Sequence, residues 1–290
     1  MMPVAVSGGV ALHCPDDGRY AFFNSPYPAH RLMTGLDIYP NTENNSSFPS
    51  PVSGAILQVR QVKAPRGHGF EAPEQDVVTI IGSGQSPGVV VKLLHVDTRV
   101  EVGDEICVGE PLGPLVRSGY FGYHTPLHAH IEVRPADDPI RVRGAHTMNS
   151  LLDLEGLEAT EELTGTVLLT RKGFAQIRPI GTPRVVVDVG GSPGIIDGGI
   201  PLYGWFGTHT QNAKPGTSVR LLGKEIGIVR KVGPHTCIAD CTKFNAHLGE
   251  IPVDMFFVLT PMQQTVVAVT SKKRGELDLN AGNEVSVTVS

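Results

Sequence analysis

The chain has 290 residues, of which 40% are hydrophobic, and this is enough for two ordinary domains with apolar cores. Its net charge is −5 and no basic cluster occurs, which argues against a nucleic-acid partner. No apolar stretch approaches the roughly 20 residues of a membrane helix, and the amino-terminal MMPVAVSGGVALHCPDDG lacks the basic start of a signal peptide. We therefore expect a cytoplasmic protein with no membrane partner and with reduced cysteines.

The stretch 1–147 consists of short apolar runs that alternate with turn sequences such as PDDG and GSGQSPG. Glycine (34 residues) and proline (23 residues) are spread evenly, which is typical of many short strands joined by turns. The runs include VSGAILQVRQV (52–62), DVVTIIG (76–82), VVVKLLHV (89–96) and HAHIEVRP (128–135). This pattern predicts a β-barrel or β-sandwich domain.

The stretch 148–163, MNSLLDLEGLEATEEL, is rich in leucine and glutamate and predicts a short helix or an ordered linker. After it, β patterning returns in runs such as TGTVLLTR, RVVVDVG, SVRLLGKEIGIVRKV, DMFFVLT, QTVVAVTS and EVSVTVS. The last run alternates valine with polar residues, as a half-exposed strand does. A second, mostly β domain of unknown role is therefore expected at about 164–290, which makes the whole chain all-β.

The sequence LHAHIEVRP (127–135) contains two histidines two residues apart. In a strand, His128, His130, Glu132 and Arg134 share one face, and the apolar residues between them share the other. The backbone positions of two such histidines lie roughly 6–7 Å apart, so that one imidazole can bind a metal while the other faces the molecule bound to that metal. The alternative is a polar outer face that contains two histidines without a function.

The order of motifs around this strand resembles that of the LytM/lysostaphin-type zinc metallopeptidases. That family shows H-x-G-x-D, then a P-x-x-G-x-V strand, a strand that carries one histidine, a V-x-x-G-x-x-V-x-x-G-x-x-I-G pattern and finally H-L-H-F-E. Here TGLDIYP, FPSPVSGAILQV, VVVKLLHV, VEVGDEICVGEPLG and LHAHIEV follow in the same order over about residues 25–140. The resemblance implies a duplicated-hybrid-motif barrel or sandwich for this half. No family resemblance covers the second half.

The resemblance also implies roles for individual residues. The metal-binding aspartate of the family falls on Asp37, and the metal-binding histidine of H-x-H falls on His130. The two catalytic histidines fall on His128 and His95. In such enzymes zinc keeps an open position for water and for the substrate carbonyl. The two catalytic histidines take a proton from that water and stabilise the tetrahedral oxyanion.

One position departs from the family pattern. Met33 stands where the first metal-binding histidine is expected, and a thioether suits copper(I) better than zinc. Two protein ligands alone would hold zinc loosely. His30 can restore the third ligand if the backbone before Met33 loops back, which Pro26 and Pro28 permit; otherwise it is an exposed loop histidine. His124 is another spare imidazole near the histidine strand.

Three functions remain open at this point. The first is a zinc-dependent hydrolase that cuts a peptide or amide bond, with His30, Asp37 and His130 as metal ligands. The second is a non-catalytic module that binds a protein partner and retains only the barrel. The third is a phosphocarrier in which His95 and His128 form the required pair of neighbouring histidines.

The second half contains two further features of interest. His235, Cys237, Cys241 and His247 are residue types that bind zinc, but their spacing H-x-C-x3-C-x5-H matches no common zinc motif, and a free cysteine also behaves as a small core residue. The glycine-rich run DVGGSPGIIDGGIPLYGWFG (188–207) lacks the order of a phosphate-binding loop. It predicts a long ordered loop anchored by Trp205.

Overall fold

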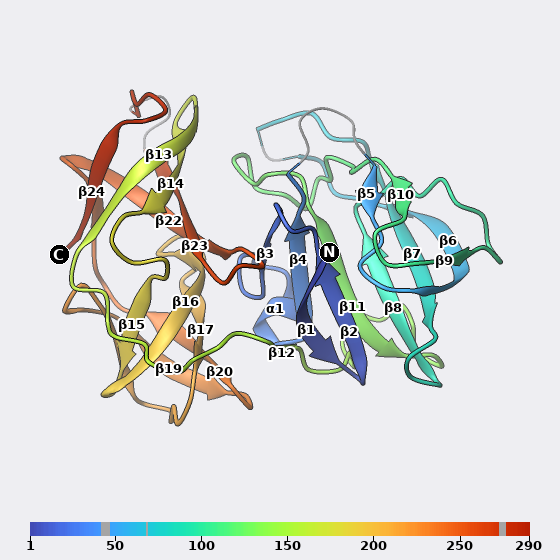
Figure 1. Ribbon diagram of the computed structural model, residues 1–290. Coiled ribbons are helices and arrows are strands. Elements are labelled where there is room, and N and C mark those ends of the chain that lie inside the picture. Colours follow the sequence, from blue (N-terminus) through green and yellow to red (C-terminus); the bar gives the residue numbers. More distant parts are fainter. Residues whose placement is uncertain (42–46, 68, 273–276) are drawn as a thin grey trace. The chain divides into compact units, whose positions relative to one another are not determined.

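The computed structural model describes residues 1–41, 47–67, 69–272 and 277–290 (Figure 1). These residues fold as two compact units. Unit 1 comprises Met1–Tyr20 and Tyr27–Leu151, and unit 2 comprises Ala21–Pro26 and Leu152–Ser290. The short segment Ala21–Pro26 therefore belongs to unit 2, although its neighbours on both sides in the sequence belong to unit 1. No helix in the described ranges is long and apolar enough to cross a membrane.

Unit 1 is built on an antiparallel sheet with the strand order β4–β11–β8–β7–β6–β9. The four runs predicted as strands in this half form β6, β7, β8 and β11, so the all-β prediction is confirmed here. The elements of residues 1–151 are β1 (Met2–Ser7), β2 (Val10–Cys14), β3 (Arg19–Ala21, whose last residue belongs to unit 2), α1 (Pro28–Arg31), β4 (Gly35–Tyr39), β5 (Phe48–Pro49), β6 (Gly54–Lys63), β7 (Gln75–Ser83), β8 (Val89–Leu94), β9 (Glu105–Ile106), β10 (Pro111–Gly113), β11 (Ala129–Pro135) and β12 (Asn149–Ser150).

Unit 2 contains two rings of antiparallel strands, and each ring closes on itself. One runs β13–β14–β23–β22–β21–β24 and returns to β13. The other runs β15–β16–β17–β20–β19–β18 and returns to β15. The strands are β13 (Leu163–Arg171), β14 (Phe174–Pro179), β15 (Val186–Val189), β16 (Ser192–Ile200), β17 (Trp205–Thr210), β18 (Ser218–Leu221), β19 (Lys224–Val232), β20 (Thr236–Cys241), β21 (Ala246–Leu248), β22 (Ile251–Leu259), β23 (Thr265–Ser271) and β24 (Glu284–Val289).

Closure of each ring leaves no long unpaired strand edge among the described residues of unit 2, which removes a common cause of aggregation in β proteins. The buried apolar side chains of the rings form one core cluster that includes Val187, Phe206, Met255 and Phe257. The alternating run EVSVTVS behaves as expected, because Val287 and Val289 on β24 are buried and the polar residues between them are exposed. The prediction of a second, mostly β part is therefore also confirmed.

The stretch 148–163 contains no helix, so the helical alternative for it is wrong. Asn149–Ser150 forms β12, and the chain then runs without regular structure to β13. Its amides bond to distant partners instead of to the preceding turn: Leu151 N–H donates to the Val4 carbonyl, and Thr160 N–H donates to the Val186 carbonyl. These tertiary contacts outweigh the helix propensity of leucine and glutamate.

The predicted long loop at 188–207 is also wrong, because most of this run lies in β15, β16 and β17. Strand β16 pairs with β15, β17 and β22 along its length. Ile195, Ile196 and Ile200 are fully buried in it, and Trp205 begins β17. Buried isoleucines therefore determine the structure here, and the glycines between them mark close approaches of other residues.

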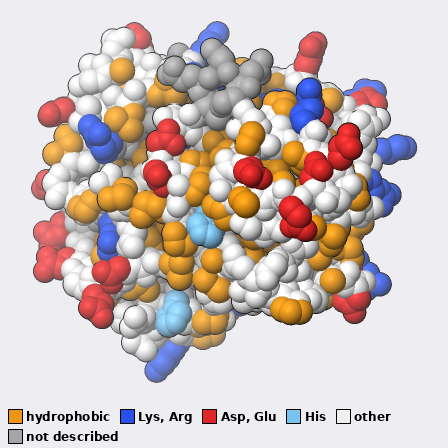
Figure 2. Space-filling model, turned by 45° about the vertical axis from the view of Figure 1, so that its right-hand side comes forward, with side chains coloured by type: hydrophobic (Ala, Val, Ile, Leu, Met, Phe, Trp, Pro, Cys, Tyr) orange, Lys and Arg blue, Asp and Glu red, His pale blue; other side chains and the backbone are white. Residues whose placement is uncertain are grey.

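All four cysteines are free. Burial raises the pKa of the Cys14 and Cys237 thiols to about 12, so both are inert at neutral pH. Figure 2 shows one face of the molecule, on which basic, acidic and hydrophobic side chains are interspersed. No continuous basic surface is visible among the side chains coloured in that view.

Candidate metal centre

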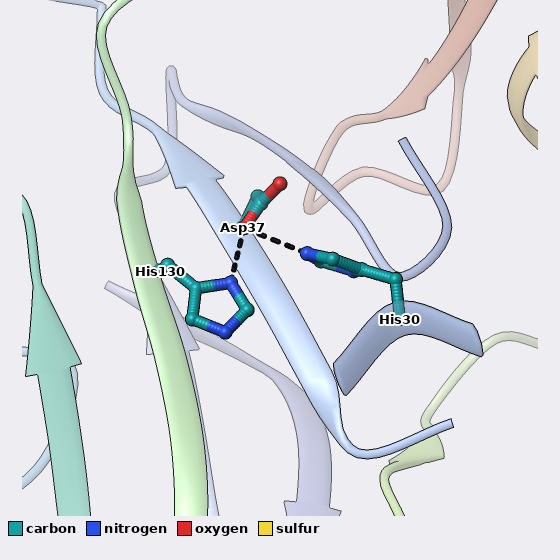
Figure 3. Close-up of side chains that lie close together, drawn as sticks. All are labelled: His30, Asp37 and His130. Atoms are coloured by element: carbon teal, nitrogen blue, oxygen red, sulfur yellow. Dashed lines mark hydrogen bonds and ion pairs between the residues drawn. The ribbon is translucent and has the colours of Figure 1, made fainter. Parts of the chain in front are cut away.

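Three side chains from three different segments meet inside unit 1: His30 from α1, Asp37 from β4 and His130 from β11 (Figure 3). Strands β4 and β11 are paired so that His130 lies directly opposite Asp37. His130 Nδ1 is 2.8 Å from Asp37 Oδ1, and His30 Nε2 is 3.2 Å from the same oxygen. One potential ligand atom from each residue lies within 4.8 Å of the other two.

Helix α1 explains how His30 reaches Asp37 from a position three residues before the expected one. The helix ends in a Schellman motif, in which Thr34 N–H donates to the Ala29 carbonyl and Met33 N–H donates to the His30 carbonyl. Met33 takes the left-handed conformation that this motif requires, with φ of 64°. Met33 is therefore the residue that ends the helix, and the turn before it brings His30 to Asp37.

Gly35 lies between the two imidazoles and has no room for a side chain. A Cβ atom at this position would lie 2.9 Å from His130 Cε1 and 3.2 Å from His30 Cε1. It would also lie 3.2 Å from the Ala29 methyl group. The glycine of TGLD thus allows both histidines to approach Asp37 from opposite sides of β4.

The three residues fit a zinc ion by donor type and by spacing. Two imidazoles and one carboxylate are a ligand set that zinc uses in open, catalytic sites. Ligand bonds of about 2.0–2.1 Å in a tetrahedron place the donor atoms roughly 3.3 Å apart, and the separations of 2.8 and 3.2 Å are close to this. Asp37 Oδ2 and His130 Nε2 are buried and make no hydrogen bond within the part of the chain that is described.

Behind His130 lies a buried carboxylate, Glu132, on the same strand. Its Oε1 atom is 3.6 Å from His130 Nε2. Lys92 Nζ donates to Oε1 at 2.9 Å, and Arg134 donates to Oε2 at 3.0 Å. An outer carboxylate of this kind orients a metal-binding imidazole by accepting from the nitrogen that does not bind the metal. Glu132 lies on the Nε2 side of the His130 ring, and Nδ1 on the other side faces Asp37.

The charges in this cluster reinforce one another. Burial opposes ionisation of Asp37, but its histidine neighbours hold the pKa of the carboxyl well below its usual range. Burial lowers the pKa of His130, but Asp37 and Glu132 outweigh this and raise it to about 9. Likewise, His130 and Lys92 outweigh the burial of Glu132 and lower its pKa to about 2. Without a metal, the centre therefore holds a proton on His130 at neutral pH.

His128 stands beside the three ligand residues in a defined tautomer. Its Nδ1 atom is 3.0 Å from the Pro126 carbonyl, which can only accept, so Nδ1 carries the hydrogen. Its Nε2 atom lies 3.6 Å from Asp37 Oδ2. Burial lowers the pKa of His128 to about 4, despite the opposing charge of Asp37. At neutral pH His128 is thus an uncharged imidazole with a lone pair on the nitrogen that faces the centre.

His95 follows β8 directly and is oriented by a residue that the sequence did not single out, Asp76 at the start of β7. His95 Nδ1 is 2.5 Å from Asp76 Oδ2. Burial opposes ionisation of Asp76, but the hydrogen bond and charge of His95 lower its pKa. His95 has a φ of 70°, a conformation that is rare for a residue other than glycine and typical of functional sites. In the sequence, Asp76 is distinguished only as a charged residue at the start of an apolar run that forms a buried strand.

Aromatic rings surround these histidines. Phe121 stacks on His128 with ring centroids 4.2 Å apart, and it meets the ring of His95 edge-on at 4.8 Å. Tyr27 meets His130 edge-on at 5.0 Å, and Tyr39 lies 4.9 Å from His128. No pattern in the sequence indicates this aromatic shell. Such a shell lowers the local dielectric, which strengthens the interactions of charged groups inside it.

The face of β11 that carries the histidines is buried, so the alternative of a polar outer face is wrong. His124 packs beside Tyr123 and does not join the cluster. In unit 2, His235 is exposed, Cys237 lies inside its ring, and His247 belongs to β21 of the other ring. These residues form no metal-binding group among the residues that the structure describes.

Comparison with known proteins yields a matching family model and similar solved structures. A family model described as the N-terminal domain of a "Domain of unknown function (DUF8155)" matches residues 11–150. Among curated proteins nothing matches. One similar solved structure is the catalytic domain, in mutant form, of the prophage-encoded M23 protein EnpA from Enterococcus faecalis. The two chains are 19% identical over 39% of this chain and 72% of that one, with a TM-score of 0.25. At that TM-score the likeness says nothing about what this chain does.

Proposed function

We propose that unit 1 binds one zinc ion through His30, Asp37 and His130 and hydrolyses a peptide or amide bond. The observation that carries this proposal is the convergence of three buried donor atoms beside His128 and His95, two histidines that are oriented by other partners. A metal centre alone needs only the ligands. The two additional imidazoles are the groups that proton transfer requires.

When bound, zinc would polarise a substrate carbonyl and lower the pKa of a bound water. His128 has its proton on Nδ1, held by the Pro126 carbonyl, so its Nε2 atom would be able to accept a proton from a water at the centre. His95 is held through Nδ1 by Asp76, so its Nε2 atom remains to interact with the substrate oxygen. Glu132 Oε1 lies 3.6 Å from Nε2 of His130, and the aromatic shell excludes bulk water. The substrate class in this proposal is a peptide or another amide.

A second candidate, a non-catalytic module with a structural metal centre, is favoured by one observation. His30 and Asp37 are 0% exposed, and the exposed fractions of His95, His128 and His130 are 5, 4 and 3%. A substrate needs access to at least two of these residues. In this second candidate the same metal site stabilises unit 1, and the barrel binds a protein partner.

The phosphocarrier alternative receives less support. The rings of His95 and His128 are close, with centroids 5.6 Å apart. However, the Nδ1 atoms of both rings are already engaged, one by the Asp76 carboxylate and one by the Pro126 carbonyl. A phosphoryl group on either ring would lie near the carboxylates of Asp37 and Asp76, which repel it.

The test separates metal binding from catalysis. The purified full-length protein is titrated with zinc and with cobalt(II), and bound metal is counted by elemental analysis. We expect about one ion per chain, and loss of binding in His30→Ala, Asp37→Ala and His130→Ala. His235→Ala, which changes an exposed histidine of unit 2, is the matched control. A wild-type chain that takes up no metal from excess zinc contradicts the proposal.

Catalysis is then measured on the zinc-loaded protein with a peptide library and mass spectrometry. We expect His128→Ala and His95→Ala to keep the metal and to lose turnover by about 10²–10⁴-fold. Metal binding without turnover of any library member would support the non-catalytic module instead. Turnover that persists unchanged in both variants would remove the assigned roles of these two histidines.

A further inference from the structure

The segment 118–127, which precedes β11, covers one side of the candidate metal centre. Phe121 is only 4% exposed, whereas the adjacent Tyr120 is 48% exposed. The Phe121 ring stacks on His128 with centroids 4.2 Å apart and an interplanar angle of 22°, and it meets the ring of His95 at 4.8 Å and 81°. Phe121 therefore points inward from this segment, onto both histidines.

The Phe121 ring occupies space that a substrate would need. His95 and His128 are almost fully buried, so a substrate reaches them only if a covering group moves. Tyr39, which also contacts His128, lies on β4, and β4 is paired with β11. A displacement of Tyr39 would break this pairing. Phe121 lies outside the strands, so it is a cover that can move while the sheet stays intact.

The backbone hydrogen bonds around Phe121 are local. Phe121 N–H donates to the Ser118 carbonyl at 3.1 Å, and Thr125 N–H donates to the Gly122 carbonyl at 3.1 Å. Gly122 N–H donates in return to Thr125 Oγ1, also at 3.1 Å. A displacement of the segment as one piece therefore leaves these bonds intact.

Arg117 connects the segment to a neighbouring loop. Its guanidinium donates to the carbonyls of Gly122 at 3.1 Å, of Tyr123 at 2.8 Å and of Thr125. The same guanidinium lies over the Phe70 ring, 4.3 Å from the ring centroid. Because Arg117 is partly exposed, water can replace these hydrogen bonds when the segment moves, and the net cost of breaking each one is small.

We propose that residues 118–127 form a lid over the centre, in which Phe121 is a plug that a substrate displaces and Arg117 is the latch that holds the lid closed. Opening exposes His95 and His128 to solvent, and closing excludes water from them. The lid accounts for the burial of the centre in a protein that is able to catalyse a reaction. The inference rests on the proposed function for the entry of a substrate, whereas the opening itself requires no metal.

The experiment measures access to these histidines in the metal-free full-length protein. Diethyl pyrocarbonate acylates an accessible, uncharged imidazole, and mass spectrometry of peptides gives the reaction rate at each histidine. The low pKa of His128 keeps its ring uncharged at neutral pH, so its rate reports access. Phe121→Ala removes the plug, and Arg117→Met removes the hydrogen bonds of the latch. Tyr123→Ala, which removes an exposed ring of the same lid, is the matched control.

We expect His95 and His128 to react about tenfold faster in Phe121→Ala and Arg117→Met and at the wild-type rate in Tyr123→Ala. Hydrogen–deuterium exchange at the amides of β8 and β11, which should stay at wild-type rates, monitors unfolding of unit 1. Unchanged reactivity in both lid variants, or equal acceleration in the control, would overturn the inference. So would acceleration that occurs only together with faster exchange in β8 and β11, because the segment would then be part of the core.

Acceleration in one lid variant alone would overturn the role of the residue whose substitution had no effect. The lid and the proposed function can also fail separately. If the wild type takes up no zinc, the proposed function fails, while the reaction rates in the metal-free protein still decide whether the lid opens. If the wild type binds zinc and cleaves peptides but the lid variants leave the histidine rates unchanged, the proposed function stands and the lid is overturned.

Discussion

At the level of single residues, the chemistry of the centre depends on which nitrogen of each imidazole carries a hydrogen. Pro126 sets this for His128, and Asp76 sets it for His95. Neither partner was assigned a role from the sequence. Pro126 is 2 residues from its histidine, whereas Asp76 is 19 residues from His95. Only the folded chain brings Asp76 to His95.

Metal binding should release a proton, because the metal-free centre holds one. Asp37 and Glu132 raise the pKa of His130 to about 9, so its ring is charged at pH 7, and a metal at Nδ1 has to displace that proton. We expect zinc binding to release about one proton at pH 7 and less as the pH approaches 9. Calorimetric titrations in two buffers of different ionisation enthalpy measure this number. Zinc binding at pH 7 that is independent of the buffer would contradict the prediction.

Asp76 should matter for turnover and not for metal binding. Asp76→Asn removes the charge that orients His95 while it retains the shape of the side chain. We expect kcat to fall by about 10²–10⁴-fold, with zinc affinity unchanged. The control is Asp97→Asn, because Asp97 pairs with Arg99 at the surface. A loss of zinc binding in Asp76→Asn would show that this residue supports the fold of the centre and not the reaction.

At the level of elements, β4 and β11 were predictable as the strands that carry the site, and α1 was not. The alternation in HAHIEVR predicts one face with His128 and His130, and the pairing of β11 with β4 makes that face adjacent to Asp37. Helix α1 has only four residues, fewer than an apolar period needs to be recognisable. Its position follows from the Schellman motif at Met33 and from the contacts of His30, both of which are properties of the folded chain.

Gly35 on β4 offers a test of this packing. Gly35→Ala places a methyl group against the rings of His30 and His130, so both imidazoles have to move from Asp37. We expect zinc affinity to fall about tenfold or more, and stability to fall by about 1–3 kcal/mol. Gly84→Ala is the control, because a Cβ at Gly84 meets nothing within 4 Å. Unchanged zinc affinity in Gly35→Ala would mean that these two rings do not hold the metal.

At the level of the whole molecule, the buried charges of unit 1 make the stability of the metal-free protein depend on pH. The pKa of His130 is about 9, above its ordinary value, so its stabilising effect is complete below pH 6.5 and is lost as the pH rises towards 9. The pKa of His128 is about 4, below its ordinary value, so the folded state disfavours protonation of this ring. The contribution of His128 to stability is therefore fully present above pH 6.5 and is lost as the pH falls towards 4. These two residues together place the stability maximum of the centre near pH 6.5.

Thermal unfolding of the metal-free protein between pH 5 and 9 tests this balance. We expect the wild type to lose stability on both sides of about pH 6.5, by on the order of 3 kcal/mol towards pH 9. His130→Gln should remove the decline on the alkaline side and leave the acid side. Trp205 fluorescence follows unit 2 in the same samples, because this residue lies in β17. An alkaline decline that persists in His130→Gln would have to come from other groups.

The sequence by itself determined the all-β class of both halves, because alternating and apolar runs between turns are local patterns. It also determined the candidates Asp37, His95, His128 and His130, through the parity of their strands and a resemblance that depends on motif order. Only the tertiary structure decided the place of His30, the orienting role of Asp76, and the strands in the glycine-rich run, where Gly198 and Gly207 make room for Phe23. These features arise from contacts between segments that are distant in the chain, and such contacts leave no periodic pattern in the residues that make them.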